Sequence, residues 1–273
     1  RSANSEASAH LRAAINLLTS LPVDNESRRK ELDLQMALGT ATRAIRGHAS
    51  DETLMVYSRA RELLDERVNA KDQISVLYGL WSVNVVRCEY LAGLDIARQS
   101  LEVAERHQEP EVSAFANRMM GLTLWATGRF AEAVPHLRRA VALYAPGQGN
   151  VTDLRYAQDH AVWAQMMLAL NLWALGHSDQ AANAATQSLE WAREIGHAMT
   201  TGFALAFGSV LHAFSNFDGS GSGAFAAQTL RYCLEHDLRA YQPWAQFYHG
   251  LYQFRLGDHI AGLEAMQAGM DKA

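Results

Sequence analysis

The chain has 273 residues, 49% of them hydrophobic and 19% charged, and its 24 basic and 29 acidic side chains give a formal net charge of −5. This length and composition allow one or two hydrophobic cores and exclude global disorder. The absence of a basic excess argues against a protein that binds the phosphate backbone of a nucleic acid. Two cysteines, Cys88 and Cys233, are too few for a disulfide framework and suit a reducing cytoplasm, where we expect the protein to reside.

The start of the chain and its longest uncharged stretch bear on targeting. Residues 1–10 are polar and no apolar segment follows directly, so we expect no secretory signal. The stretch at 197–217 lacks charged side chains but contains Thr, Ser, His and Asn, which makes it too polar for a typical lipid span. A buried helix in a protein without membrane segments explains it better.

Taken in order, the long apolar segments each end in a small break. The chain contains only five prolines, so the segments themselves are expected to be helical. The breaks recur at intervals of about forty residues. Their centres are Gly47, Cys88, Gly128, Gly176, Ser215 and Gly257. This period predicts six helical hairpins, with a helix A before each break and a helix B after it.

Polar and proline residues near the predicted helix ends agree with this division. Ser50, the pair at 178–179 and Asp258 lie where helices B begin, and their oxygens can accept hydrogen bonds from free N–H groups there. Pro110 and Pro243 fall in the first turn of helices A, where a missing N–H costs nothing.

The clearest unit spans residues 116–146. Gly121 and Ala133 allow helices A and B to touch, and Leu137 fills the space beside them. The full pattern is Gly121, Leu124, Gly128, Phe130, Ala133, Leu137, Ala140 and Pro146. It resembles the tetratricopeptide repeat (TPR). The resemblance implies an all-α fold, a right-handed α-solenoid of about six TPR-like hairpins forming a single superhelical domain over residues 1–273. A generic helical bundle with similar Gly/Ala spacing remains the alternative.

Two segments interrupt the repeat. Residues 145–160 form an insertion after the third hairpin, and such loops are either functional or tolerated. Gly219-Ser220-Gly221-Ser222-Gly223 is not followed by the Lys-Ser or Lys-Thr pair of a phosphate loop. We interpret residues 219–223 as a flexible linker within the domain.

Beyond the repeat, the chain is similar to the C-terminal TPR region of bacterial class III adenylate/guanylate cyclase proteins that carry an AAA-type, STAND-like ATPase. The matching segments are RSAN at 1–4, AHLR at 9–12, ELDLQMALG at 31–39, YGLW at 78–81, GRFAEA at 128–133 and YAQD at 156–159. Cys88 departs from the family's glycine, and the Gly-rich surroundings of its Gln-Asp pair are Ala157, His160 and Ala161 here. The resemblance implies a signal-transduction protein whose cyclase and ATPase domains are absent from this sequence.

The repeat register predicts which side chains line a concave surface formed by helices A. They include four of the six tryptophans, and aromatic and arginine side chains are strong anchors for a ligand. The insertion adds Arg155 and Tyr156. The candidate ligand-binding residues are Phe115, Arg118, Trp125, Arg155, Tyr156, Trp163, Trp173, His212, Trp244, Phe247 and Arg255. The alternative is that the inner face fills itself, so that Trp125, Trp163 and Trp173 are ordinary core.

Catalytic and metal sites have little support in the sequence. The inner positions carry no pair of carboxylates for acid–base chemistry, and the neighbouring acid and histidine at 159–160 point apart on a helix. The eleven histidines show no metal-ligand spacing. We expect a non-catalytic binding or sensor module without cofactor or metal, which recognises a protein segment, a peptide or a small molecule. A scaffold that uses convex or edge surfaces and, less favoured, a hydrolytic enzyme are the alternatives.

Overall fold

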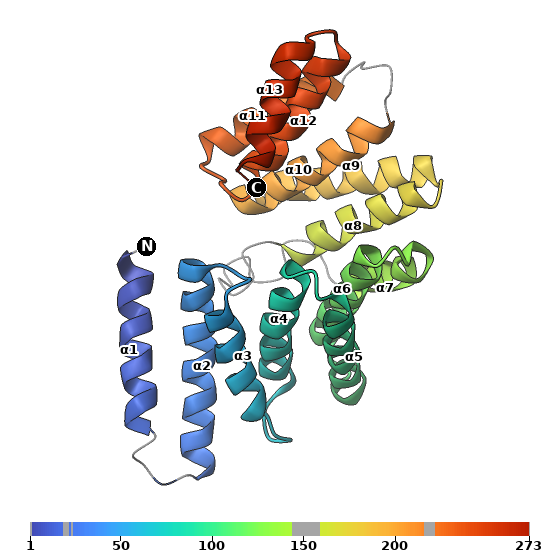
Figure 1. Cartoon of the computed structure of the whole chain (residues 1–273). Coiled ribbons are helices and arrows are strands. Elements are labelled where there is room, and N and C mark those ends of the chain that lie inside the picture. Colours follow the sequence, from blue (N-terminus) through green and yellow to red (C-terminus); the bar gives the residue numbers. More distant parts are fainter. Residues whose placement is uncertain (1, 19–21, 23, 144–158, 216–221, 273) are drawn as a thin grey trace. The chain divides into compact units, whose positions relative to one another are not determined.

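The computed structural model describes residues 2–18, 22, 24–143, 159–215 and 222–272. Within these ranges the regular secondary structure consists of thirteen α-helices (Figure 1). The chain divides into two compact units, Arg1–Leu143 and Tyr144–Ala273. Arg155, Tyr156 and most of the predicted insertion lie outside the described residues. The all-α repeat architecture predicted from the sequence is confirmed.

The first unit contains one leading helix and three hairpins. Its helices are α1 (Ser2–Leu18), α2 (Asn25–Arg46), α3 (Asp51–Glu62), α4 (Ala70–Val86), α5 (Tyr90–His107), α6 (Pro110–Ala126) and α7 (Phe130–Leu143). Each helix packs against its neighbour in sequence, and the A helices α2, α4 and α6 also contact one another in succession. Helices α1 to α5 stand side by side in Figure 1. Such nearest-neighbour packing is the signature of a repeat protein.

The second unit contains the other three hairpins. Its helices are α8 (His160–Ala174), α9 (Ser178–Ile195), α10 (Ala198–Ser215), α11 (Ser222–Glu235), α12 (Gln242–Arg255) and α13 (His259–Met270). The A helices α8, α10 and α12 again contact one another in succession. Of the predicted linker, Ser222 and Gly223 belong to α11, and Ser222 is buried, so the predicted segment extends too far. The rest of the linker lies outside the described residues.

Left-handed backbone marks the turns inside the hairpins. The central residues of five predicted breaks all have positive φ: Gly47 (89°), Cys88 (61°), Gly128 (75°), Gly176 (83°) and Gly257 (100°). Glycine adopts this conformation without a steric penalty, whereas Cys88 does so against the preference of an L-residue. The sixth break, Ser215, is the last residue of α10. The spacing of the breaks therefore located the turns of the repeat correctly.

Close packing inside the hairpins also follows the prediction. Gly121 on α6 faces α7, and a Cβ placed there would lie 2.6 Å from Cγ of Leu137. Leu137 and Ala133 are both fully buried. The small residue on one helix and the large residue on the other thus interlock, as the TPR-like pattern predicted.

Side-chain caps fix several helix starts. Ser50 accepts a hydrogen bond from the Thr53 backbone N–H at 3.2 Å, and Asp258 accepts one from that of Ala261 at 3.3 Å. These caps confirm the two predicted starts of α3 and α13. Asp24 and Ser27 form a reciprocal capping box at α2, a signal that sequence reasoning missed. In the described part of the chain, no helix has the length and apolar character needed to cross a membrane.

Candidate functional site

In the first unit, two of the predicted site residues, Phe115 and Arg118, form a closed cluster with Tyr78. Phe115 and Arg118 on α6 are 5% and 4% exposed. Phe115 and Tyr78 of α4 meet edge to face with ring centroids 5.2 Å apart. The Arg118 guanidinium lies 5.6 Å from the Tyr78 centroid and 5.3 Å from that of Phe115. A desolvated cation–π contact of this kind stabilises the fold. Trp125, at the end of α6, is half-buried.

In the second unit, four aromatic rings form a continuous stack across three A helices. Trp163 of α8 stacks on Phe203 of α10 at 5.7 Å, Phe203 contacts Phe207 at 4.6 Å, and Phe207 stacks on Trp244 of α12 at 5.8 Å. We call Trp163, Phe203, Phe207 and Trp244 the aromatic stripe. The stacked pairs Trp163–Phe203 and Phe207–Trp244 are favourable beyond simple burial, and the tilted Phe203–Phe207 pair joins them.

Exposure changes along the aromatic stripe. Trp163 and Phe203 are 8% and 2% exposed, whereas Trp244 is 47% exposed. Beside Trp244 lies a pocket of about 180 Å³, lined by Pro243, Trp244, Phe247, Tyr248, Gly269 and Met270. The stripe therefore begins in the core of the unit and ends at an accessible apolar pocket.

The remaining predicted residues of the second unit contact their own neighbours. Trp173 is half-buried and contacts Phe214 of α10 with centroids 5.4 Å apart. His212 stacks on Phe225 of α11 at 4.2 Å, so it faces helix B of its own hairpin. Burial lowers the pKa of His212 below its ordinary value of 6.5. Arg255 donates a hydrogen bond to the Ala213 carbonyl at 2.5 Å, which ties α12 to the end of α10.

Phe203 and Phe207 were missed by the sequence-based prediction. On α10 the prediction named His212 alone. The available signal was the spacing of Phe203, Phe207 and Phe214, which places all three on one stripe of a helix.

Reactive side chains do not converge in the described residues. Burial raises the pKa of the Cys233 thiol to about 11, which keeps it protonated at neutral pH. Asp159 uses its carboxylate to cap α8, accepting from the backbone N–H groups of Ala161 and Val162 at 2.9 and 3.0 Å. Within the described ranges, no three His, Cys, Asp or Glu side chains are placed to hold a metal ion.

Comparisons with known proteins identify the fold. No family model matches the sequence, and no curated protein matches it. Among solved structures, the apo form of RapI matches with a TM-score of 0.74 and 11% identity, covering 97% of this chain and 89% of that one. A Rap protein complexed with Competence and Sporulation Factor matches with a TM-score of 0.71 and 13% identity, covering 99% and 71%. The fold is that of TPR-like helical-repeat proteins.

A third neighbour carries the same kind of repeat within a larger protein. It is a Signal Transduction ATPase with Numerous Domains (STAND) from Pyrococcus horikoshii that has a tetratricopeptide repeat sensor. The TM-score is 0.60 and the identity 15%, over 96% of this chain and 39% of the STAND protein. At these identities the likeness establishes the architecture alone.

Proposed function

We propose that the chain is a non-catalytic binding module that recognises a segment of a protein or peptide through the accessible end of the aromatic stripe. The observation that carries this proposal is the rise in exposure from Trp163 to Trp244 along one continuous stack. The buried rings hold Trp244 in place. Little side-chain conformational entropy is therefore lost when a partner binds to it. Pre-positioned aromatic side chains of this kind dominate binding energy at many interfaces.

The size of the neighbouring pocket favours a side chain over a whole small molecule. Its volume of about 180 Å³ is below the roughly 300 Å³ at which drug-sized ligand sites begin. Phe247, Tyr248 and Met270 make its lining apolar. A single large apolar side chain of a partner segment matches both the volume and the lining, while the flanking residues of that segment would cover Trp244.

The neighbours support a regulatory setting for such a module. One is a Rap protein complexed with Competence and Sporulation Factor, and another is a STAND protein with a TPR sensor. We propose by analogy that this chain serves as the sensor region of a bacterial cytoplasmic signalling protein, including the cyclase–ATPase kind that its sequence resembles. Co-expression with candidate ATPase and cyclase domains, followed by activity measurements with and without the module, tests that setting.

Peptide selection tests the binding site itself. A phage-displayed library of random peptides is panned on the intact chain, and selected peptides are titrated against wild type, Trp244→Ala and Ile260→Ala. Ile260 is 75% exposed on α13 and outside the stripe, so it is the matched control. We expect Trp244→Ala to abolish binding of the selected peptides and Ile260→Ala to leave it unchanged. Equal binding to all three proteins would overturn the proposed site.

A further inference from the structure

Helix α13 has an apolar face that no described helix covers. Among the described helices, α13 packs only on α12, its partner in the hairpin (Figure 1). Leu263 and Met270 are 56% and 54% exposed, and Met266 between them is partly buried. Residues at i, i+3 and i+7 form one stripe along a helix. We call Leu263, Met266 and Met270 the α13 face.

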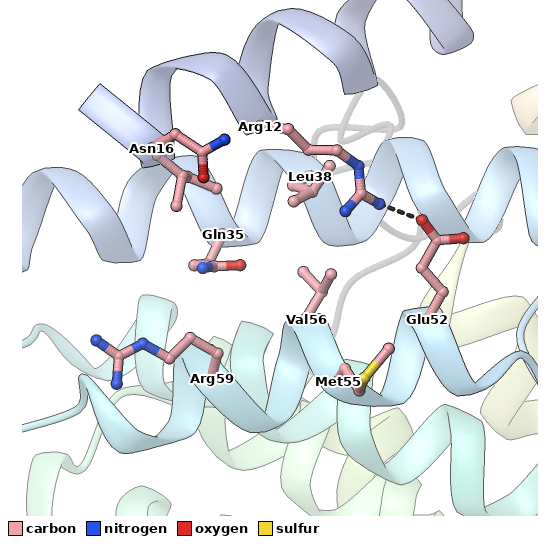
Figure 2. Close-up of a pocket in the computed structure, with 9 residues that line it drawn as sticks. Arg12, Asn16, Gln35, Leu38, Glu52, Met55, Val56 and Arg59 are labelled. Atoms are coloured by element: carbon pink, nitrogen blue, oxygen red, sulfur yellow. Dashed lines mark hydrogen bonds and ion pairs between the residues drawn. The ribbon is translucent and has the colours of Figure 1, made fainter. Parts of the chain in front are cut away.

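Helix α1 of the first unit shows the more usual polar outer surface. Arg12 on α1 reaches across the recess between α1, α2 and α3 to Glu52 (Figure 2). In the described part of α1, Leu17 is the one exposed large apolar side chain, and the other exposed residues are small or polar. Outer helices of repeat arrays need such polar surfaces to stay soluble. The apolar α13 face is therefore typical of a surface that a partner covers.

The other hairpins show what covers the equivalent positions elsewhere. Counted from the preceding break, Leu94 of α5 takes the place of Leu263, and it is 6% exposed. Leu189 of α9 takes the place of Met270, and it is 8% exposed. The next A helix, α6 or α10, packs on each of these B helices. A B helix with an A helix on it thus buries the positions that α13 leaves open.

Ile260 is exposed on the same helix but lies outside the α13 face. Its counterpart on α5 is Leu91, which is 78% exposed even though α6 packs on α5. This position therefore stays in solvent when an A helix covers a B helix. Ile260, 75% exposed, is for this reason a matched control for Leu263.

The packing of α6 defines the direction of an incoming A helix. Phe115 of α6 meets Tyr78 of α4 at 5.2 Å, and farther along both helices the Trp81 indole donates to the Thr123 hydroxyl at 2.8 Å. A Cβ placed on Gly93, near the start of α5, would lie 3.8 Å from Cγ2 of Thr123, near the end of α6. An incoming A helix therefore runs parallel to the preceding A helix and antiparallel to the preceding B helix.

Aromatic contacts join successive A helices, and the equivalent contact on α12 falls at the pocket beside Trp244. Phe247 lies ten residues before its break, as Tyr78 does, and Tyr78 contacts Phe115 of the following A helix. Phe247, Trp244 and Met270 line the pocket of about 180 Å³. Phe115 lies in the second turn of α6. An aromatic side chain in the first two turns of an incoming helix is therefore placed to enter this pocket.

We propose that the partner segment is an amphipathic α-helix of another protein, which lies on α13 as α6 lies on α5. It runs antiparallel to α13 with its N-terminal end at Trp244, and an aromatic side chain in its first two turns occupies the pocket. Apolar side chains farther along the helix cover Leu263 and Met266. This inference rests on the proposed function, because the same pocket anchors the partner, and it adds the partner's secondary structure, direction and anchoring residue.

Peptides selected on the intact chain test the inference. A phage-displayed library of random 17-residue peptides, the length of α6, is panned on the chain. Each selected peptide is titrated against wild type, Leu263→Glu and Ile260→Glu. We expect Leu263→Glu to weaken binding at least about tenfold, because it buries a charge under the partner helix, and Ile260→Glu to leave binding unchanged. Both side chains are exposed, so both variants should keep the Tm of wild type.

Two further measurements test the helix and its direction. Circular dichroism should show a gain of helix when a selected peptide binds, and a proline in the middle of the peptide should abolish binding. In the chain labelled with 5-fluorotryptophan, a nitroxide at the N-terminus of the peptide should broaden the Trp244 resonance more than one at the C-terminus. Stronger broadening from the C-terminal nitroxide, or peptides that bind without gaining helix, would overturn the inference.

The variants separate this inference from the proposed function. Binding that is lost in Trp244→Ala but kept in Leu263→Glu would overturn the helix on α13 and leave the aromatic stripe as the site. Binding that neither variant changes would overturn both. Binding that only Leu263→Glu weakens would overturn the proposed function and the pocket as the anchor. A dimer of the free chain that Leu263→Glu dissociates in sedimentation would assign the α13 face to a second copy and would also overturn the inference.

Discussion

Aromatic side chains of the A helices are used differently in the two units. In the first unit, Tyr78 and Phe115 close around Arg118, and the cluster is buried. In the second unit, the aromatic stripe leads from buried Trp163 to half-exposed Trp244. The same repeat architecture thus produces a sealed cluster in one unit and an accessible surface in the other. The difference arises because Trp244 stacks on Phe207 of the preceding helix and lines an open pocket.

The largest expected effect separates the two ends of the aromatic stripe. Trp163→Ala should lower the free energy of unfolding of the second unit by about 3–5 kcal/mol, because it empties a buried and stacked position. Trp244→Ala should cost only about 1 kcal/mol, the value of one stacking contact at a half-exposed site. Denaturant titration followed by circular dichroism measures both. Similar losses in the two variants would mean that the stripe has no accessible end.

The next largest effect on stability is expected when the cation of the sealed cluster, Arg118, is removed. Arg118→Met keeps an apolar stem but loses the guanidinium over Tyr78 and Phe115, so we expect a loss of about 2 kcal/mol in the stability of the first unit. Arg255→Met in the second unit should cost about 1 kcal/mol, the value of its hydrogen bond to Ala213. If thermal denaturation showed Arg118→Met to be neutral, the cluster would not be a structural core.

A smaller effect is expected at the turn of the second hairpin. Cys88 has a φ of 61°, and Cys88→Gly should stabilise the protein by about 1 kcal/mol by relieving the left-handed backbone. The matched change Gly128→Ala, at a φ of 75°, should destabilise it by a comparable amount. Melting temperatures that move in the same direction for both variants would contradict this account of the turns.

The smallest effect concerns pH. Burial lowers the pKa of His212, so the folded state holds the neutral ring while the unfolded chain takes up a proton near pH 6.5. The stability that the neutral ring contributes is present above that pH and is lost as the pH falls through it. His212→Phe should therefore reduce the fall in Tm between about pH 7 and about pH 5. An unchanged pH profile would show that His212 titrates as freely in the folded state.

The sequence predicted the hairpins because each depends on local chemistry. Breaks at Gly47, Gly128 and Gly176 signal left-handed turns, and small residues such as Gly121 signal close helix contact. On α10 the register was taken from Ser215, a break without glycine, and the residue that it selected, His212, stacks on Phe225 of α11. Phe203 and Phe207 lie on the stripe because of how α10 packs between α8 and α12, which is a tertiary property.

The burial of Gln35 on α2 was not predictable from the sequence for the same physical reason. A glutamine on an amphipathic helix is ordinarily solvated, and nothing in the pattern around it announces burial. Its burial results from α1 and α3 both packing on α2. The ligand-binding role of Arg155 and Tyr156 and the organisation of the chain as a single domain stay predictions.

Fluorine NMR of the chain labelled with 5-fluorotryptophan tests the central claim most directly. A peptide selected from the library is titrated in, and the Trp244 signal is assigned by its absence in Trp244→Phe. If the aromatic stripe is the binding surface, the Trp244 resonance shifts as peptide is added and the shift reaches saturation. The Trp81 resonance should stay in place, because that indole is buried and donates to Thr123 at 2.8 Å. Saturation of binding without any change at Trp244 would contradict the account.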